Sequence, residues 1–121
     1  ISLMGFKKNR FDYICSSKLM CITSKWEGFG LMAIESLALG VPVITTGVGG
    51  LKDIVTKDCG CICMSDDEFI KAITIHLTNK SIYREKCKNT MKRAKTLENI
   101  DEYMNELKNI YTSILDGSIK R

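Results

Sequence analysis

Two glycine-containing segments of the sequence could bind a negatively charged ligand. Residues 24–30 read SKWEGFG, with Gly28 and Gly30 just before an apolar run, and residues 47–50 read GVGG before a shorter one. Glycine lets a backbone approach a ligand closely, and the free N–H groups at the start of a helix attract anions. Two such loops side by side would suit a diphosphate, whereas each loop alone is equally well explained by a tight turn.

Two carboxylates accompany these segments. Glu35 lies within residues 31–39 (LMAIESLAL), whose composition predicts a helix buried nearly all round. A carboxylate is costly to bury unless it is paired with a cation or meets a polar ligand. We therefore expect Glu35 to accept hydrogen bonds from ligand hydroxyls, and a salt bridge to a Lys or Arg elsewhere in the chain is the alternative. Glu27 belongs to the loop itself and follows Trp26, which we expect to pack against the loop.

The cysteines and the single histidine favour no metal site. The six cysteines form no C-x-x-C pair, and His76 has no second metal-binding side chain near it in the sequence. Cys59, Cys61 and Cys63 alternate, which would place all three on one face of a strand, in a poor geometry for a metal ion. Small, buried, apolar residues in a reducing compartment are the better interpretation. We expect His76 at the surface or at the edge of the core.

The overall composition indicates one globular domain over residues 1–121. Hydrophobic residues are 45% and charged residues 26% of the chain, which excludes disordered and fibrous proteins. Neither a membrane span nor a secretory signal is visible, so we expect a cytoplasmic location, with at most peripheral contact at the inner face of a membrane. The net charge of +4 is mild, and most basic residues are mixed with acidic ones after residue 70, as on solvated helices. No motif indicates nucleic-acid binding.

Strands and helices alternate along the chain and must position these residues. We expect strands at residues 2–4, 19–23, 43–46 and 61–64. We expect helices at residues 10–17, 29–39 and 51–55, followed by three more that begin near Ser65, Ser81 and Asn99. Continuously apolar strands joined by helices form a parallel sheet covered on both faces. The fold class is therefore α/β, a Rossmann-like doubly wound sheet ending in helices, in which ligands bind at the carboxyl ends of the strands.

The first of the later helices carries a clear local signal. Ser65 and Glu68 have the spacing of a capping box, which predicts the start of a helix at this point. The helical period would turn four apolar side chains of this helix inward: Phe69, Ile70, Ile73 and Leu77. The last helix shows an apolar face over four turns, with members at positions 100, 103, 104, 107, 110, 111, 114 and 115.

The glycine segments and the two glutamates together resemble the signature of a known family. The matching residues are Glu27-Gly28-Phe29-Gly30, Glu35, Gly40-Val41-Pro42-Val43-Ile44 and Gly49-Gly50. They look like the motif of retaining glycosyltransferases of the GT-B fold, family 4 (glycosyl transferases group 1), which carries two glutamates separated by seven residues. The resemblance covers nearly the whole chain and implies the second half of a C-terminal, donor-binding domain. Asp53 and Ser36 depart from the Glu and Ala that are usual there.

The resemblance also implies roles for individual residues. Glu27 would be the catalytic residue that contacts the donor sugar near its reacting carbon, and Glu35 would accept hydrogen bonds from the ribose hydroxyls. The remaining donor-binding residues would be Gly28, Phe29, Gly30 and Leu31, of which the last three offer N–H groups to the diphosphate, with Gly49 and Gly50 close to the phosphates or the sugar. The family needs no essential metal. Its phosphate-binding Arg and Lys lie upstream of this chain, so we expect the chain alone to be inactive.

The function implied by the resemblance is transfer of a sugar, with retained anomeric configuration, from a nucleotide diphosphate sugar to a glycan or lipid-linked acceptor, as in bacterial polysaccharide synthesis. An N-terminal domain outside this chain would bind the acceptor. Two alternatives stay open. One is a nucleotide-sugar 2-epimerase of the same fold, and the other is a non-catalytic nucleotide-binding module.

Overall fold

The computed structural model describes the backbone of residues 1–115 and the side chains of residues 1–99 and 104–114. Within this part of the chain, three short parallel strands form one sheet: β1 (Met20–Ile22), β2 (Val43–Thr45) and β3 (Gly60–Ile62). Their spatial order is β1-β2-β3, with Met20 opposite Val43 and Val43 opposite Gly60. Because the strands are parallel, the loops that follow them leave from the same edge of the sheet.

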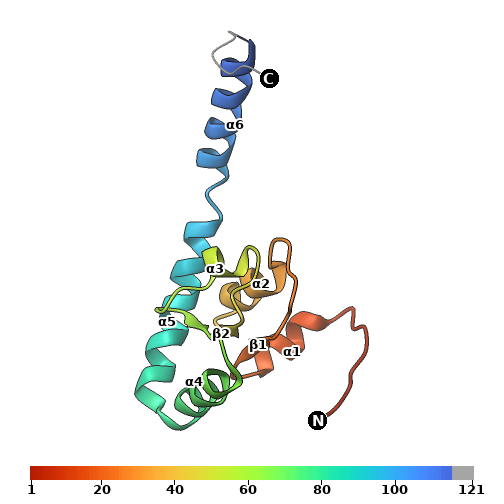
Figure 1. The fold of residues 1–121 in the computed structure, drawn as a ribbon, viewed down its shortest axis with the longest axis vertical. Helices are drawn as coiled ribbons and strands as arrows, with labels where there is room; N and C mark the ends of the chain where they lie inside the picture. Colours follow the sequence, from red (N-terminus) through yellow and green to blue (C-terminus); the bar gives the residue numbers. More distant parts are fainter. Residues whose placement is uncertain (116–121) are drawn as a thin grey trace.

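Helices cover both faces of this sheet and continue the chain beyond it (Figure 1). α1 (Arg10–Ser16) precedes β1, α2 (Leu31–Ala38) connects β1 to β2, and α3 (Leu51–Ile54) connects β2 to β3. α4 (Asp66–Thr78), α5 (Lys80–Leu97) and α6 (Ile100–Leu115) follow the sheet, and α6 extends away from it in Figure 1. None of the helices in the described part of the chain combines the length and the hydrophobicity that crossing a bilayer requires.

The hydrophobic core has one cluster on each face of the sheet. On one face, Val43 packs with residues of α2, α3 and α5, among them Leu37, Leu51 and Ala94. On the other face, Ile44 packs with Cys63 and with Ala72 of α4. Val43 and Ile44 are neighbours on β2 and are both fully buried, which requires a strand covered on both faces. The predicted α/β parallel sheet is confirmed.

The helices and three of the strands form where the sequence predicts them, with shifts at their ends. One half of the capping box is present, since Ser65 Oγ accepts a hydrogen bond from Glu68 N at 3.3 Å. The Glu68 carboxylate reaches one residue further back than expected, where its Oε2 accepts a hydrogen bond from Met64 N at 2.7 Å. The predicted strand at residues 2–4 is wrong. These residues run as an extended segment away from the sheet (Figure 1), and no described strand pairs with the outer edge of β1.

The sequence predicts that the three alternating cysteines share one face of a strand, and this prediction is wrong. β3 begins only at Gly60, so Cys59 precedes the strand and is buried in the cluster formed with α2, α3 and α5. Cys61 and Cys63 face the opposite cluster, with Ile44. Gly60 permits this close pairing because a Cβ there would lie 2.0 Å from Val43 O.

The inward face of α4 is rotated from the predicted one. Ile70 and Leu77 are exposed, whereas Ala72 and His76 are buried. His76 is only 6% exposed and belongs to neither core cluster, so of the two predicted positions the surface is excluded and the edge of the core fits. Its ring Nδ1 lies 2.7 Å from Ala72 O in the same helix, whereas the buried Nε2 has no hydrogen-bond partner among the described residues. Of the predicted apolar face of α6, residues 100, 103 and 115 lie outside the described side chains, and Met104, Ile110, Tyr111 and Ile114 are exposed.

Candidate functional site

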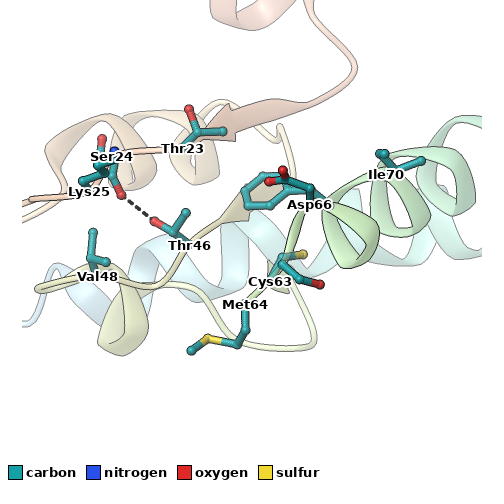
Figure 2. A pocket seen from close by; sticks show the side chains of 11 residues that line it. Thr23, Ser24, Lys25, Thr46, Val48, Cys63, Met64, Asp66 and Ile70 are labelled. Carbon is teal, nitrogen blue, oxygen red and sulfur yellow. Dashed lines mark hydrogen bonds between the residues drawn. The ribbon is translucent and has the colours of Figure 1, made fainter.

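The two glycine-containing loops meet at the carboxyl edge of the sheet. The first loop follows β1 and the second follows β2. Gly50 N donates a hydrogen bond to Gly28 O at 3.2 Å, and Thr46 Oγ1 donates one to Ser24 O at 2.8 Å (Figure 2). These two bonds join the loops at separate points, so the two segments that the sequence predicts as neighbours do lie side by side.

Glycine is required where the two loops touch. A Cβ on Gly49 would lie 1.8 Å from Glu27 O, and one on Gly50 would lie 2.7 Å from Phe29 O. Gly49 also has a φ of +56°, which other residues rarely adopt. The close approach that these two glycines permit is therefore an approach of loop to loop. Gly28 differs, because nothing lies within 4 Å of its Cβ position, which leaves room for another molecule.

The N-terminus of α2 presents backbone donors without acceptors. Gly30 stands at the N-cap position with a φ of +86°, and no side chain caps the helix. In α2, the first amide that has an acceptor is Ala33 N, which donates a hydrogen bond to Gly30 O at 2.9 Å. Within the described residues, no acceptor is found for the amides of residues 29–32. Such groups, at the positive end of a helix dipole, form a binding site for an anion.

Glu35 is paired with an arginine from α1. Arg10 Nη2 donates to Glu35 Oε1 at 2.7 Å and Arg10 Nε donates to Oε2 at 3.1 Å, so the pair is bidentate. The hydrogen bond from Arg10 lowers the pKa of Glu35 and outweighs the opposing effect of burial. The sequence left two partners open for the Glu35 carboxylate, ligand hydroxyls or a Lys or Arg side chain. The structure shows the second, Arg10. The burial of Glu35 therefore does not by itself require a ligand, and its role in ligand binding rests on its position.

α2 is less buried than its composition predicts. Ala33, Ser36 and Leu37 are buried, but Leu31 and Met32 are exposed, so one side of the helix is open. The side chain of Glu35 lies between these sides, 22% exposed, and its partner Arg10 is 51% exposed. The ion pair is consequently within reach of a molecule that binds along the open side of α2.

The loop side chains are also more exposed than expected. Trp26 is 92% exposed, so the prediction that it packs against the loop is wrong. Phe29 is also exposed. Glu27 is half-buried, and its carboxylate has no hydrogen-bond or ion-pair partner among the described side chains.

One cavity adjoins these loops, and a second lies beside Arg10. A cleft of about 820 Å³ lies at the carboxyl ends of all three strands (Figure 2) and is lined by Thr23, Ser24, Lys25, Thr46, Val48, Cys63, Met64, Ser65, Asp66, Phe69 and Ile70. A cavity of about 500 Å³ lies beside Arg10, with walls from the N-terminal segment, α1 and α2 that include Phe6, Tyr13 and Met32. The sequence did not indicate the second cavity, because the N-terminal segment carries no motif. No group of three metal-binding side chains is found within the described residues.

The chain is similar to known glycosyltransferases in sequence and in fold. A family model described as "Glycosyl transferases group 1" matches residues 2–96. The lipopolysaccharide core biosynthesis mannosyltransferase LpsB of Rhizobium meliloti is 37% identical over 70 residues, which are 55% of this chain and 20% of that protein. N-acetyl-alpha-D-glucosaminyl L-malate synthase of Bacillus anthracis is 35% identical over 68 residues, 55% of this chain and 18% of that protein. This chain thus spans about a fifth of the length of these relatives.

A solved structure shows the same fold. Sucrose-phosphate synthase from Thermosynechococcus elongatus superimposes with a TM-score of 0.69 and 27% identity, covering 87% of this chain and 27% of that one. The parallel sheet and its helices are therefore those of a GT-B glycosyltransferase. With the family model matching most of its residues, the chain belongs to the glycosyl transferases group 1 family.

Proposed function

We propose that this chain is the donor-binding part of a retaining glycosyltransferase, which transfers a sugar from a nucleotide diphosphate sugar to a glycan or lipid-linked acceptor. One observation carries the proposal: the uncapped N-terminus of α2 is held beside Glu27 by the contact between the two glycine-containing loops. The relative named for lipopolysaccharide core biosynthesis supports a place in bacterial surface polysaccharide synthesis. The chain spans about a fifth of the length of these relatives, so we propose the transfer activity for the whole protein and donor binding for this chain.

The diphosphate of the donor binds at the N-terminus of α2. The amides of residues 29–31 donate to its oxygens, and the helix dipole adds a favourable charge interaction. Negative charge increases on the leaving diphosphate as the bond to the sugar breaks. Donors already aimed at that position stabilise the transition state without having to reorganise. In this proposal the N-terminus of α2 stabilises the negative charge on the leaving diphosphate. We expect no essential metal.

The two glutamates bind different parts of the donor. Glu35 accepts hydrogen bonds from the ribose hydroxyls, since Arg10 keeps it ionised and a carboxylate has about four lone-pair sites, of which Arg10 uses two. The apolar cavity beside Arg10, with Phe6 and Tyr13 in its wall, suits the flat ring of the nucleobase. Glu27, whose carboxylate is unpartnered among the described side chains, contacts the sugar hydroxyls near the reacting carbon.

Calorimetry and a transfer assay on the full-length enzyme test these assignments. We expect Glu35→Gln to weaken the binding of free UDP, GDP or ADP about tenfold or more, because a ribose hydroxyl loses a charged acceptor. We expect Glu27→Ala to leave that affinity unchanged and to lower the rate of sugar transfer. Glu85→Gln, at an exposed position on α5, is the matched control.

Three outcomes would contradict the proposal. Unchanged nucleotide affinity in Glu35→Gln, with an unchanged melting temperature, would remove the ribose assignment. Formation of a free epimer from the nucleotide sugar without any acceptor would favour a nucleotide-sugar 2-epimerase. Binding of nucleotide by the full-length protein without any turnover would favour a non-catalytic module.

A further inference from the structure

Two thiols that the proposed function does not use lie together at the end of β3. The thiol of Cys63 donates a hydrogen bond to the sulfur of Cys61, with 3.8 Å between the two sulfur atoms. Both side chains belong to the core cluster around Ile44. Cys61 is half-buried, whereas Cys63 is 2% exposed. The pair therefore has one sulfur that solvent can reach and a second sulfur directly behind it.

We infer that Cys61 and Cys63 form a modification site, at which a small disulfide of the glutathione class converts the two thiols into an intramolecular disulfide. A disulfide has an S–S distance of about 2.05 Å, so the two sulfurs must approach by about 1.8 Å. Cys63 lies just beyond the last residue of β3, so it is not held within the strand on both sides. Side-chain rotation and a small backbone adjustment bring the sulfurs together.

The reaction proceeds by two thiol–disulfide exchanges. The Cys61 thiol loses its proton to solvent and attacks one sulfur of the small disulfide, which forms a mixed disulfide and releases the other half as a thiol. The Cys63 thiol then loses its proton and attacks the Cys61 sulfur, which releases the second half as a thiol. The two protein thiols lose two protons and two electrons, and the small disulfide is reduced to two small thiols.

The burial of Cys63 decides the order of these steps. Burial, the hydrogen bond to Cys61 and the nearby groups Cys61, Glu68 and Cys21 raise the pKa of Cys63 to about 12. At neutral pH Cys63 is therefore a thiol and not a thiolate, and only thiolates attack disulfides. As the pH rises toward that pKa, the thiolate fraction of Cys63 increases about tenfold per pH unit. The second exchange should become about tenfold faster per pH unit in the same range.

The modification would reach the cleft at the carboxyl ends of the strands. Cys63 lines that cleft (Figure 2), together with Lys25 and Asp66, the charged side chains in its wall. Cys63 N donates to Thr45 O at 2.8 Å, so the backbone is held to β2 and the side chain must make most of the movement. Oxidation thus changes the wall of the cleft while the sheet is retained.

Peptide mapping after treatment of the folded protein with oxidised glutathione at pH 8 tests the site. Free thiols are alkylated after unfolding, and the tryptic peptide of residues 58–71 is analysed by mass spectrometry. We expect this peptide to lose two hydrogen atoms and to carry one alkylated cysteine, Cys59. Cys59→Ser is the matched control and should give the same disulfide, because Cys59 lies on the opposite face of the sheet.

Variants of the pair distinguish this site from general thiol oxidation. Cys63→Ala should stop at a glutathione adduct on Cys61, and Cys61→Ala should leave Cys63 unmodified. If Cys63→Ala fails to fold, Cys61→Ala, at the half-exposed position, tests the same claim. A disulfide that still forms in either variant would overturn the inference. So would a wild-type peptide with three free thiols, or with glutathione retained on Cys61, under conditions that modify the exposed Cys15.

Discussion

The N-termini of α2 and α4 lie at the same edge of the sheet and are built in opposite ways. α4 has a serine cap, Ser65, and three acidic residues in its first turn, Asp66, Asp67 and Glu68. α2 begins after Gly30, has no side-chain cap, and has no acidic residue in its first turn. Acidic side chains at a helix start stabilise the dipole from within the chain. α4 thus supplies its own negative charge, whereas α2 leaves that position for the negative charge of another molecule.

The contrast separates a helix start that serves stability from one that serves binding. Capping α4 contributes to folding whether or not a ligand is present. The open start of α2 costs stability in the free protein, because its first amides have no acceptor in the described structure. That cost is offset by the contact between the loops, in which Gly49 and Gly50 pack on the backbone of the first loop. Changing each element separately can test this division.

The largest effect is expected from Gly49→Ala. The new Cβ would lie 1.8 Å from Glu27 O, at a φ that disfavours alanine, so the loops must separate. We expect the free energy of unfolding to fall by about 2–4 kcal/mol, from backbone strain and overpacking together. Nucleotide affinity should fall at least tenfold, because the N-terminus of α2 loses its support. Chemical denaturation and calorimetry measure the two changes.

Gly28→Ala is the matched control for this change. No atom lies within 4 Å of its Cβ position, and its φ is not positive, so stability should change by no more than about 0.5 kcal/mol. If Gly49→Ala were as stable as Gly28→Ala and bound nucleotide as tightly as the wild type, the loop contact would not support the site.

A smaller effect is expected from Ser65→Ala. This change removes the acceptor of Glu68 N and should lower the free energy of unfolding by about 1 kcal/mol. Nucleotide affinity should not change, since α4 is not the proposed phosphate site. Ser81→Ala, at an exposed serine in the first turn of α5, controls for loss of a hydroxyl. A loss of affinity in Ser65→Ala alone would mean that both helix starts contribute to binding.

The smallest effect is expected from Arg10→Gln. Arg10 lowers the pKa of Glu35, so the ion pair stabilises the fold above the ordinary pKa of a glutamate. That contribution is lost as the pH falls through the lowered pKa and Glu35 becomes protonated. In Arg10→Gln, carbon NMR of the Glu35 carboxyl should therefore show its pKa moving up toward the ordinary value.

Unfolding at two pH values completes the test of the ion pair. The stability difference between wild type and Arg10→Gln should be larger at pH 7 than at a pH below the lowered pKa of Glu35, where the carboxylate is neutralised. Lys8→Gln removes the same charge from an exposed residue nearby and should not move the pKa of Glu35. Equal shifts in both variants would show that Arg10 acts only through the general charge of the region.

Local signals in the sequence were reliable where neighbours along the chain make the interaction. Ser65 and Glu68 are three residues apart, and Ser65 Oγ accepts the hydrogen bond from Glu68 N that their spacing predicts. The glycines of both loops also mark real backbone requirements. The inward face of α4 was assigned wrongly, because a small rotation of a helix changes which side chains face the core. The cysteine segment was assigned wrongly because β3 begins only at Gly60, which leaves Cys59 outside the strand.

The sequence alone was enough to establish an alternating α/β chain, its three described strands, its helix starts and the family of its glutamate and glycine motif. These depend on short-range periodicity, capping and turn chemistry. Only the tertiary structure decided that Arg10 pairs with Glu35, that Gly49 serves contact between loops, and that Cys61 and Cys63 share a face without Cys59. Each of these joins residues through the packing of separate elements, and their relative positions depend on how those elements fill one core, which no local pattern records.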